Sequence, residues 1–367
     1  MMNNKDEILY IGFNQDQGCF ACGTQKGFKI YNTHPFKDTF KREFDGGIGI
    51  VEMLFRCNIL ALVGGGSHPK FPMNKVLLWD DHQYKCIGEL SFKSFVKAVK
   101  LRKDKVVVVL ENRIYVYNFA DLRLIDAIDT CFNPKGICAL SADQNLSVLA
   151  TPDKQKGHVK VTVYERNNSF VIVAHQSSLS CMALNFAGTL LATASDKGTL
   201  IRIFSTEDGS PLQEVRRGSD KAEIYSIAFD KNSHWIACSS DKGTIHIFHV
   251  TKTMNRIVLS DENKDDQAAQ QDEIYKTSQQ NEAEVSNDGK KAKNSKHALS
   301  FMKKILPKYF DSEWSYAQFR VQDGKALCAF SDDGQTLIAV TTDGSYYLAD
   351  IPKKKGDCIQ REKKILQ

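Results

Sequence analysis

A repeat of 39 to 46 residues runs through most of this 367-residue chain and constrains its fold more than any other feature. Each unit has two apolar strands, a glycine-containing turn and a third strand that ends in an aromatic pair. Equivalent positions, assigned to the second strand of each unit, are Phe13, Phe55, Leu101, Leu140, Leu184, Phe229 and Phe330. The last step is 101 residues, so the pattern predicts seven repeats, one of them with a long insertion. This period is typical of four-stranded β-propeller blades.

The ends of the third strands support the same fold. They are Tyr31-Asn32, Trp79-Asp80, Tyr117-Asn118, Tyr164-Glu165, Phe204-Ser205 and Phe248-His249, of which one is a literal Trp-Asp. Glycines at 27, 198, 243 and 344 follow Lys or Asp where a hairpin needs positive φ. We therefore predict an all-β, seven-bladed propeller of WD-repeat type that spans 1–367 as a single domain. Two β-sandwiches are the alternative, but a closed ring also removes exposed sheet edges.

The long step falls in the sixth unit. Residues 259–296 contain nine acids and six lysines, a net charge of −3. The whole chain has a net charge of +5, so the remainder carries +8. We predict that 259–297 is a disordered polar loop inserted in blade six, because it has too few apolar residues to offset the entropy of ordering. The basic balance of the remainder favours an anionic partner.

The end of the insertion, 298–310, mixes bulky apolar residues with lysines, a composition typical of segments that enter an anionic membrane surface. We predict that this loop end faces a membrane and that Phe301, Ile305 and Leu306 insert into it. The alternative is that the aromatic residues anchor a return strand over 314–321, and we expect Trp314 to lie in the core in either case.

Cysteine usage and hydropathy indicate a cytoplasmic protein. The apolar runs are far shorter than a membrane helix, and the first residues lack an apolar signal region. Ten cysteines are scattered without framework spacing, mostly in apolar strands, so we expect them to be reduced. Cys19 and Cys22 form one CxxC without a second pair, which favours strand packing over a metal or redox site. We expect no cofactor.

A duplicated stretch flanks the most unusual motif, the arginine pair Arg216 and Arg217. The segments ATASDKGTLIRIF (192–204) and CSSDKGTIHIF (238–248) match in their turn residues, and the pair lies between them. Adjacent residues of a strand point to opposite sides, so the two arginines are expected at the propeller rim, serving two different pockets. Hydroxyls and a histidine near each pocket would suit phosphate binding. His246 alternates with Ile245 and Ile247 and should face away from them.

These residues resemble the PROPPIN family, the seven-bladed propellers that bind polyphosphoinositides and include the WIPI autophagy proteins. The resemblance is carried by GGIGIVEMLFRCNILALVGGG, NKVLLWDD, NPKG, VRRG, SSDKGTIHIF, LPKYF and DGSYY, and is strongest to the WIPI-three and WIPI-four branch. Val215 stands where the family has Phe or Leu before Arg-Arg-Gly, which leaves the arginines in place.

The resemblance implies two lipid head-group sites. Site one comprises His175, Ser195, Thr199, Arg202 and Arg216, and site two comprises Arg217, Ser239, Ser240, Thr244 and His246. Guanidinium groups offer a donor fork for phosphate oxygens, and Ser, Thr and His donors fill the remaining lone pairs.

By the same resemblance the chain is a peripheral phosphoinositide effector that recruits autophagy machinery. Its lipids would be phosphatidylinositol 3-phosphate and 3,5-bisphosphate, on preautophagosomal, endosomal or vacuolar/lysosomal membranes. Its protein partner would be an autophagy lipid-transfer protein that contacts blades one to three around 64–72. We expect a monomer.

Other functional classes fit the sequence less well. A protein-only WD-repeat scaffold, in which the arginines bind acidic peptides, is the alternative function. Enzymatic activity is not expected, because the chain has no nucleophile elbow, metal-ligand spacing or phosphate-binding glycine loop. Its positive charge is dispersed, which disfavours nucleic acid.

Overall fold

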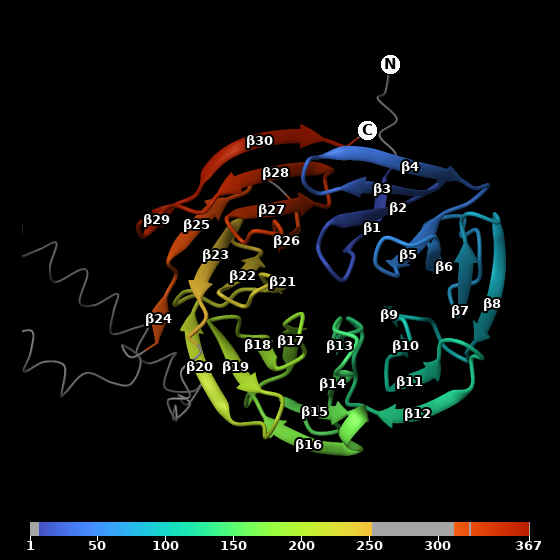
Figure 1. The fold of residues 1–367 in the computed structure, drawn as a ribbon, viewed down its shortest axis with the longest axis horizontal. Coiled ribbons are helices and arrows are strands. Elements are labelled where there is room, and N and C mark those ends of the chain that lie inside the picture. Colours follow the sequence, from blue (N-terminus) through green and yellow to red (C-terminus); the bar gives the residue numbers. More distant parts are fainter. Residues whose placement is uncertain (1–6, 252–311, 323, 367) are drawn as a thin grey trace, which may run out of the picture.

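The computed structural model describes residues 7–251, 312–322 and 324–366. Their strands form seven sheets around a common centre (Figure 1). The predicted seven-bladed β-propeller is confirmed, with one 3-10 turn, η1 (Tyr164–Arg166).

Blades one to four each contain four antiparallel strands. Blade one has β1 (Ile8–Phe13), β2 (Cys19–Thr24), β3 (Gly27–Asn32) and β4 (Lys37–Glu43). Blade two has β5 (Ile48–Met53), β6 (Ile59–Gly64), β7 (Lys75–Asp80) and β8 (Lys85–Ser91). Blade three has β9 (Ala98–Arg102), β10 (Lys105–Val109), β11 (Arg113–Asn118) and β12 (Leu124–Asp129). Blade four has β13 (Ala139–Leu140), β14 (Val148–Pro152), β15 (His158–Val163) and β16 (Asn168–Val173).

Blades five and six each gain a fifth, parallel strand at the outer edge. Blade five has β17 (Leu179–Leu184), β18 (Leu190–Ser195), β19 (Leu200–Ser205), β20 (Pro211–Arg216) and β24 (Glu313–Trp314). Blade six has β21 (Ile224–Phe229), β22 (Trp235–Ser240), β23 (Thr244–His249), β25 (Ala317–Arg320) and β29 (Gly356–Asp357). Blade seven has β26 (Ala326–Phe330), β27 (Thr336–Thr341), β28 (Ser345–Asp350) and β30 (Ile359–Ile365).

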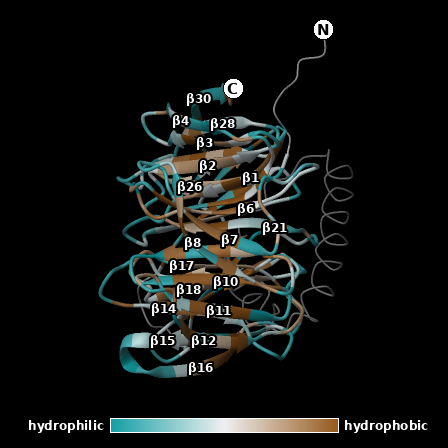
Figure 2. Cartoon of the chain, turned by 90° about the vertical axis from the view of Figure 1, so that its right-hand side faces the viewer, coloured by the Kyte–Doolittle hydropathy of each residue, from teal (hydrophilic) through white to brown (hydrophobic). Residues whose placement is uncertain are grey.

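The core is divided among the spaces between blades. Strand side chains alternate between the two faces of a sheet, so each blade packs against both neighbours. Seven apolar clusters of described residues result, one for each pair of neighbouring blades. In the side view of Figure 2, inner strands such as β10 are hydrophobic in colour, and the outer strands β16 and β30 are largely hydrophilic.

The ring closes between blades seven and one without strand exchange. Blade seven is built from the last strands of the chain alone, and packing joins it to blade one. Phe20 stacks near Tyr346, whose hydroxyl donates to the Thr33 carbonyl at 2.6 Å.

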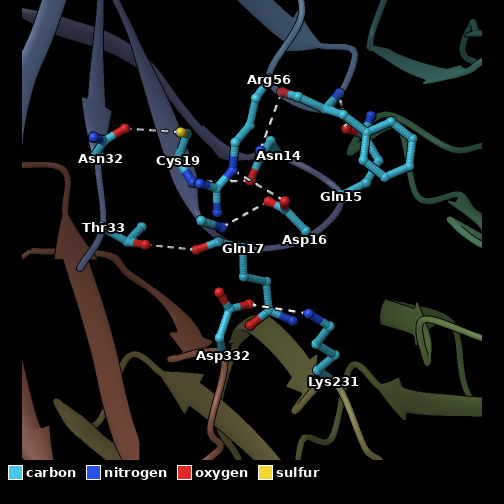
Figure 3. A network of polar contacts seen from close by, with 12 residues as sticks. Asn14, Gln15, Asp16, Gln17, Cys19, Asn32, Thr33, Arg56, Lys231 and Asp332 are labelled. Atoms are coloured by element: carbon cyan, nitrogen blue, oxygen red, sulfur yellow. Dashed lines mark hydrogen bonds and ion pairs between the residues drawn. The ribbon is translucent and has the colours of Figure 1, made fainter. Parts of the chain in front are cut away.

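Two glutamines of the β1–β2 loop join blade one to other blades (Figure 3). Gln17 donates to the Phe229 carbonyl and accepts from the Phe330 amide, both at 2.7 Å, which joins blade one to blades six and seven. Gln15 bonds blades two and three through the carbonyls of Met53 and Leu101.

The repeat positions correspond as predicted except for Phe55, but the strand assignment was wrong. Six of the seven lie in the first, innermost strands of their blades, and Phe55 follows the innermost strand β5. The predicted aromatic ends of the third strands are confirmed, apart from Tyr164, which begins η1.

The predicted turn glycines are also confirmed. Gly198 has a φ of 65° and Gly243 a φ of 70°. A Cβ at Gly198 would collide with the Ala222 carbonyl oxygen, so that turn needs glycine for space as well as conformation.

The insertion, 252–311, falls between β23 and β25, within blade six as predicted. The predictions for 259–297 and for 298–310, including Phe301, Ile305 and Leu306, lie outside the described residues. Trp314 is described, and its prediction was wrong because it is 45% exposed. It lies in β24, the outermost strand of blade five, where one side of the sheet edge borders solvent.

The CxxC cysteines separate within β2. Cys19 packs in the cluster toward blade two and Cys22 in the cluster toward blade seven, because residues three apart in a strand point to opposite faces. Burial raises the pKa of the Cys22 thiol to about 12. The two thiols therefore pack in the core separately. Among the described residues, no helix is long and apolar enough to cross a membrane.

Candidate head-group sites

The arginine pair ends the outer strand of blade five, and its side chains point in opposite directions as predicted. Val215 packs in the cluster between blades five and six. Strand alternation therefore turns Arg216 toward blade four and Arg217 toward blade six. Arg217 Nε donates to the Gly198 carbonyl at 2.9 Å, and its Nη2 donates to the Asp220 carbonyl.

Both arginines lie in the outer part of blade five, but their side chains are buried. Arg216 is fully buried and Arg217 is 6% exposed. The cause is β24, which pairs Glu313 with Val215 and Trp314 with Arg216 along the outside of β20 (Figure 1). The return of the insertion thus covers the blade edge.

Site one lies on the blade-four side of blade five, and its five residues are all buried. Arg202 Nε donates to Glu214 at 2.9 Å, and its Nη1 donates to the Ala174 carbonyl at 2.7 Å. His175 Nε2 lies 3.0 Å from the Thr193 hydroxyl. Arg202 and His175 therefore have structural partners within the protein.

Glu214 is a component of site one that the sequence analysis missed. It pairs with Arg202 across the β19–β20 ladder, and its second oxygen accepts from Ser312 Oγ at 3.0 Å. The two-residue spacing of Glu214 and Arg216 in β20 could have placed them on one face. A buried carboxylate here offsets positive charge and ties the site to the return of the insertion.

Site two lies between blades five and six. Ile245 and Ile247 pack toward blade seven, and His246 faces the other way, as predicted. His246 Nδ1 is 3.3 Å from Ser315 Oγ. Ser240 shares the blade-five face with Cys238, whereas Ser239 points to blade seven and donates to the Ala326 carbonyl at 2.5 Å. The structure therefore does not bring Ser239 to the other four residues.

The two sites differ in charge. Among the described residues, Arg217 has no ion-pair partner, and its Nε and Nη2 donate to backbone carbonyls. Burial, reinforced by the neighbouring Arg217, lowers the pKa of His246 to about 4. At neutral pH site two thus holds a buried cation beside a neutral imidazole, a combination that an anion would stabilise.

Comparisons with known proteins show the family to which this chain belongs. A model of the PROPPIN family matches residues 8–263. Autophagy-related protein 18e of Arabidopsis thaliana is 38% identical over 344 residues, which cover 93% of this chain and 82% of the relative. The chain belongs to the PROPPIN family.

Other relatives match a smaller part of the chain or match it at lower identity. Autophagy-related protein 18 of Yarrowia lipolytica is 38% identical over 270 residues, 67% of each chain. Among solved structures, Kluyveromyces lactis Hsv2 with complete loop 6CD has a TM-score of 0.74 at 23% identity, over 99% of this chain and 100% of that one. KlAtg21, solved in complex with the coiled-coil of AgAtg16, has a TM-score of 0.73, likewise at 23% identity, over 98% and 100%. These two structures show the shared fold.

The segment predicted to contact a protein partner, 64–72, connects β6 to β7 in blade two of this PROPPIN. Residues 66–70 are exposed. The connection is nevertheless held in place, because the Gly47 amide donates to the His68 carbonyl at 2.7 Å and the Lys70 amide to the Gly47 carbonyl at 3.0 Å. It presents a defined surface on the blade-two side.

Proposed function

We propose that this PROPPIN binds membranes that carry phosphatidylinositol 3-phosphate or 3,5-bisphosphate, through site one and site two, and catalyses no reaction. The observation that carries the proposal is the buried Arg217, whose charge has no carboxylate partner among the described residues. A phosphate at site two would supply the missing counter-charge, and Ser240, Thr244 and His246 would supply further donors.

Two sites on adjacent blades of one rigid body support membrane binding better than either alone. Once one head group is bound, the second binding event is intramolecular and has a high effective concentration. We propose that the apolar and basic end of the insertion, with Phe301, Ile305 and Leu306, adds contact with the bilayer.

Relatives named as autophagy-related proteins support a role in autophagy. We propose that the bound chain, as a monomer, recruits an autophagy lipid-transfer protein through the surface around 64–72 on blades one to three. It would act at preautophagosomal, endosomal or vacuolar/lysosomal membranes.

The test is titration calorimetry with soluble inositol 1,3-bisphosphate. The variants are Arg216→Gln and Arg217→Gln, because a glutamine amide can still donate to the neighbouring carbonyls while the charge is removed. We expect each variant to lose one of two binding events. A charge-assisted bond of about 1.5 to 3 kcal/mol corresponds to a loss of roughly ten- to a hundredfold. If folded wild-type protein binds no inositol phosphate, the scaffold that binds acidic peptides becomes the better account.

A further inference from the structure

The register of the sheets identifies an arginine in blade six that occupies the position of Arg216. In each blade, the first residue of the third strand pairs with one residue of the outer strand. In chain order these outer residues are Glu43, Ser91, Asp129, Val173, Arg216, Arg320 and Ile365. Only blades five and six carry arginine there, and these are the two blades of the proposed head-group sites.

The two arginines differ in exposure, and the fifth strands explain why. At blade five, β24 pairs with Arg216 itself, and that side chain is fully buried. At blade six, β29 pairs with Ala317 and Gln318 and ends before Arg320, which is exposed. Arg320 is therefore the accessible arginine of the pair.

Arg320 lines a pocket of about 650 Å³ at the turn end of blade six, next to the start of blade seven. Lys242 and Lys325 line it as well, and Tyr225, Thr244 and Gln322 supply polar groups. Asp241 is the one acid among the described lining residues, and its carboxylate accepts from the Glu223 amide at 3.0 Å. The described lining therefore has three positive charges against one negative charge.

The pocket joins site two through Thr244. Thr244 is a residue of site two, and it is also the direct cross-strand partner of Arg320. Residues that face each other across two strands have Cβ atoms about 5 Å apart and share one face of the sheet. A ligand at site two can therefore reach both groups.

The Lys325 ammonium lies 5.2 Å from the ring centroid of Tyr225, an arrangement that holds it at the pocket wall. Gln322 accepts from the Lys363 ammonium at 2.6 Å, which orients its amide. These contacts fix the outer wall of the pocket and leave the cationic groups exposed to solvent.

We propose that Arg320, with Lys242 and Lys325, binds a second phosphate of the inositol head group that occupies site two. This inference rests on the proposed function and deepens it. Site two then binds doubly phosphorylated head groups more tightly than singly phosphorylated ones. The reason is that guanidinium and ammonium groups form charge-assisted hydrogen bonds with the additional phosphate. At site one, by contrast, Arg202 is already paired to Glu214.

The test compares Arg320→Gln with Arg123→Gln, a matched control on blade three whose side chain is 84% exposed. The ligands are soluble inositol 1,3,5-trisphosphate and inositol 1,3-bisphosphate. Vesicles of phosphatidylcholine with phosphatidylinositol 3,5-bisphosphate form a third arm. We expect Arg320→Gln to weaken trisphosphate binding about tenfold and bisphosphate binding twofold or less, with the control unchanged. Arg320→Lys should recover part of the loss, and vesicle retention should fall in the same order.

Equal trisphosphate affinity for the Arg320→Gln and Arg123→Gln proteins would overturn the proposal. If Arg217→Gln still abolished bisphosphate binding at site two in that case, the proposed function would stand and only the role of Arg320 would be refuted. A loss confined to soluble ligand, with vesicle retention intact, would overturn the assignment to membrane lipid in favour of a free inositol phosphate. A wild-type protein that binds neither inositol phosphate would refute the proposed function, and this inference with it.

Discussion

The arginine pair illustrates how far individual residues could be predicted. Because successive residues of a strand point to opposite faces, their adjacency alone predicted that Arg216 and Arg217 lie on opposite sides of blade five. Their burial was not predictable, because three strands of blade six and the insertion separate β24 from β20 in the chain. The partnership of Arg202 with Glu214 was missed for a related reason, since it depends on the register of β19 and β20.

Removing one partner of that buried pair should destabilise the protein strongly. Arg202→Met leaves the Glu214 carboxylate buried without its guanidinium, which should cost about 3 kcal/mol in the free energy of unfolding. The double variant Arg202→Met/Glu214→Met should recover most of this loss. Urea denaturation of wild type, Arg202→Met, Glu214→Met and the double variant measures the coupling, and additive losses would contradict a structural pair.

Stability should depend on the protonation of His246. Its pKa is about 4 in the folded protein, below the ordinary 6.5, because burial and Arg217 disfavour the charged form. The stabilising contribution is therefore complete above pH 6.5 and is lost as the pH falls toward 4, by about 3 kcal/mol in total. Unfolding titrations of wild type and His246→Asn should diverge over this window, and parallel curves would show that His246 titrates normally.

At the level of elements, the strands followed from hydrophobic alternation and turn glycines, whereas the two added strands did not. β24 and β29 each contain two residues, too short for a periodic pattern, and both are recruited by the edge of a neighbouring sheet. Trp314 was expected in the core because aromatic residues usually are, yet it lies on one of these short outer strands.

The β1–β2 loop should contribute to ring closure through Gln17. Gln17→Ala removes two 2.7 Å hydrogen bonds and leaves the Phe229 carbonyl and Phe330 amide without that partner. We expect a loss of about 2 kcal/mol in the free energy of unfolding. Gln335→Ala, at an exposed turn, is the control. A melting temperature for Gln17→Ala equal to that of the control would contradict this role.

The insertion should be dispensable for folding and for soluble ligands. Because its composition is polar, we expect it to contribute little to the core. Lengthening a surface loop also changes the free energy of unfolding only slightly. Deletion of 261–293 should leave the melting temperature and inositol phosphate affinity near those of wild type. A large fall in melting temperature would show that the segment packs against the propeller.

At the level of the whole molecule, seven repeats predicted seven blades, and the seven inter-blade clusters confirm a closed ring. The mode of closure was not predictable, because the packing of Phe20 with Tyr346 and the bond of Gln17 with Phe330 join residues more than 300 positions apart. The class of partner was easier to predict from the sequence, because the net charge of +8 outside 259–296 favours an anionic partner.

Membrane retention should need both head-group binding and the apolar end of the insertion. Replacing Phe301, Ile305 and Leu306 with Ser should weaken vesicle retention and leave soluble inositol phosphate binding unchanged, because only the bilayer contact is removed. Vesicle flotation and calorimetry on the same preparation separate the two effects. Equal losses in both assays would mean that these residues support the fold.

The most direct measurement of the central claim is co-sedimentation of the Arg216→Gln/Arg217→Gln protein with vesicles that contain phosphatidylinositol 3-phosphate. Its thermal unfolding is recorded alongside, since both side chains are buried. We predict that the folded double variant stays in the supernatant, that each single variant is partly retained, and that wild-type retention weakens as salt rises. A folded double variant that sediments as wild type does would contradict the assignment of these arginines to lipid binding.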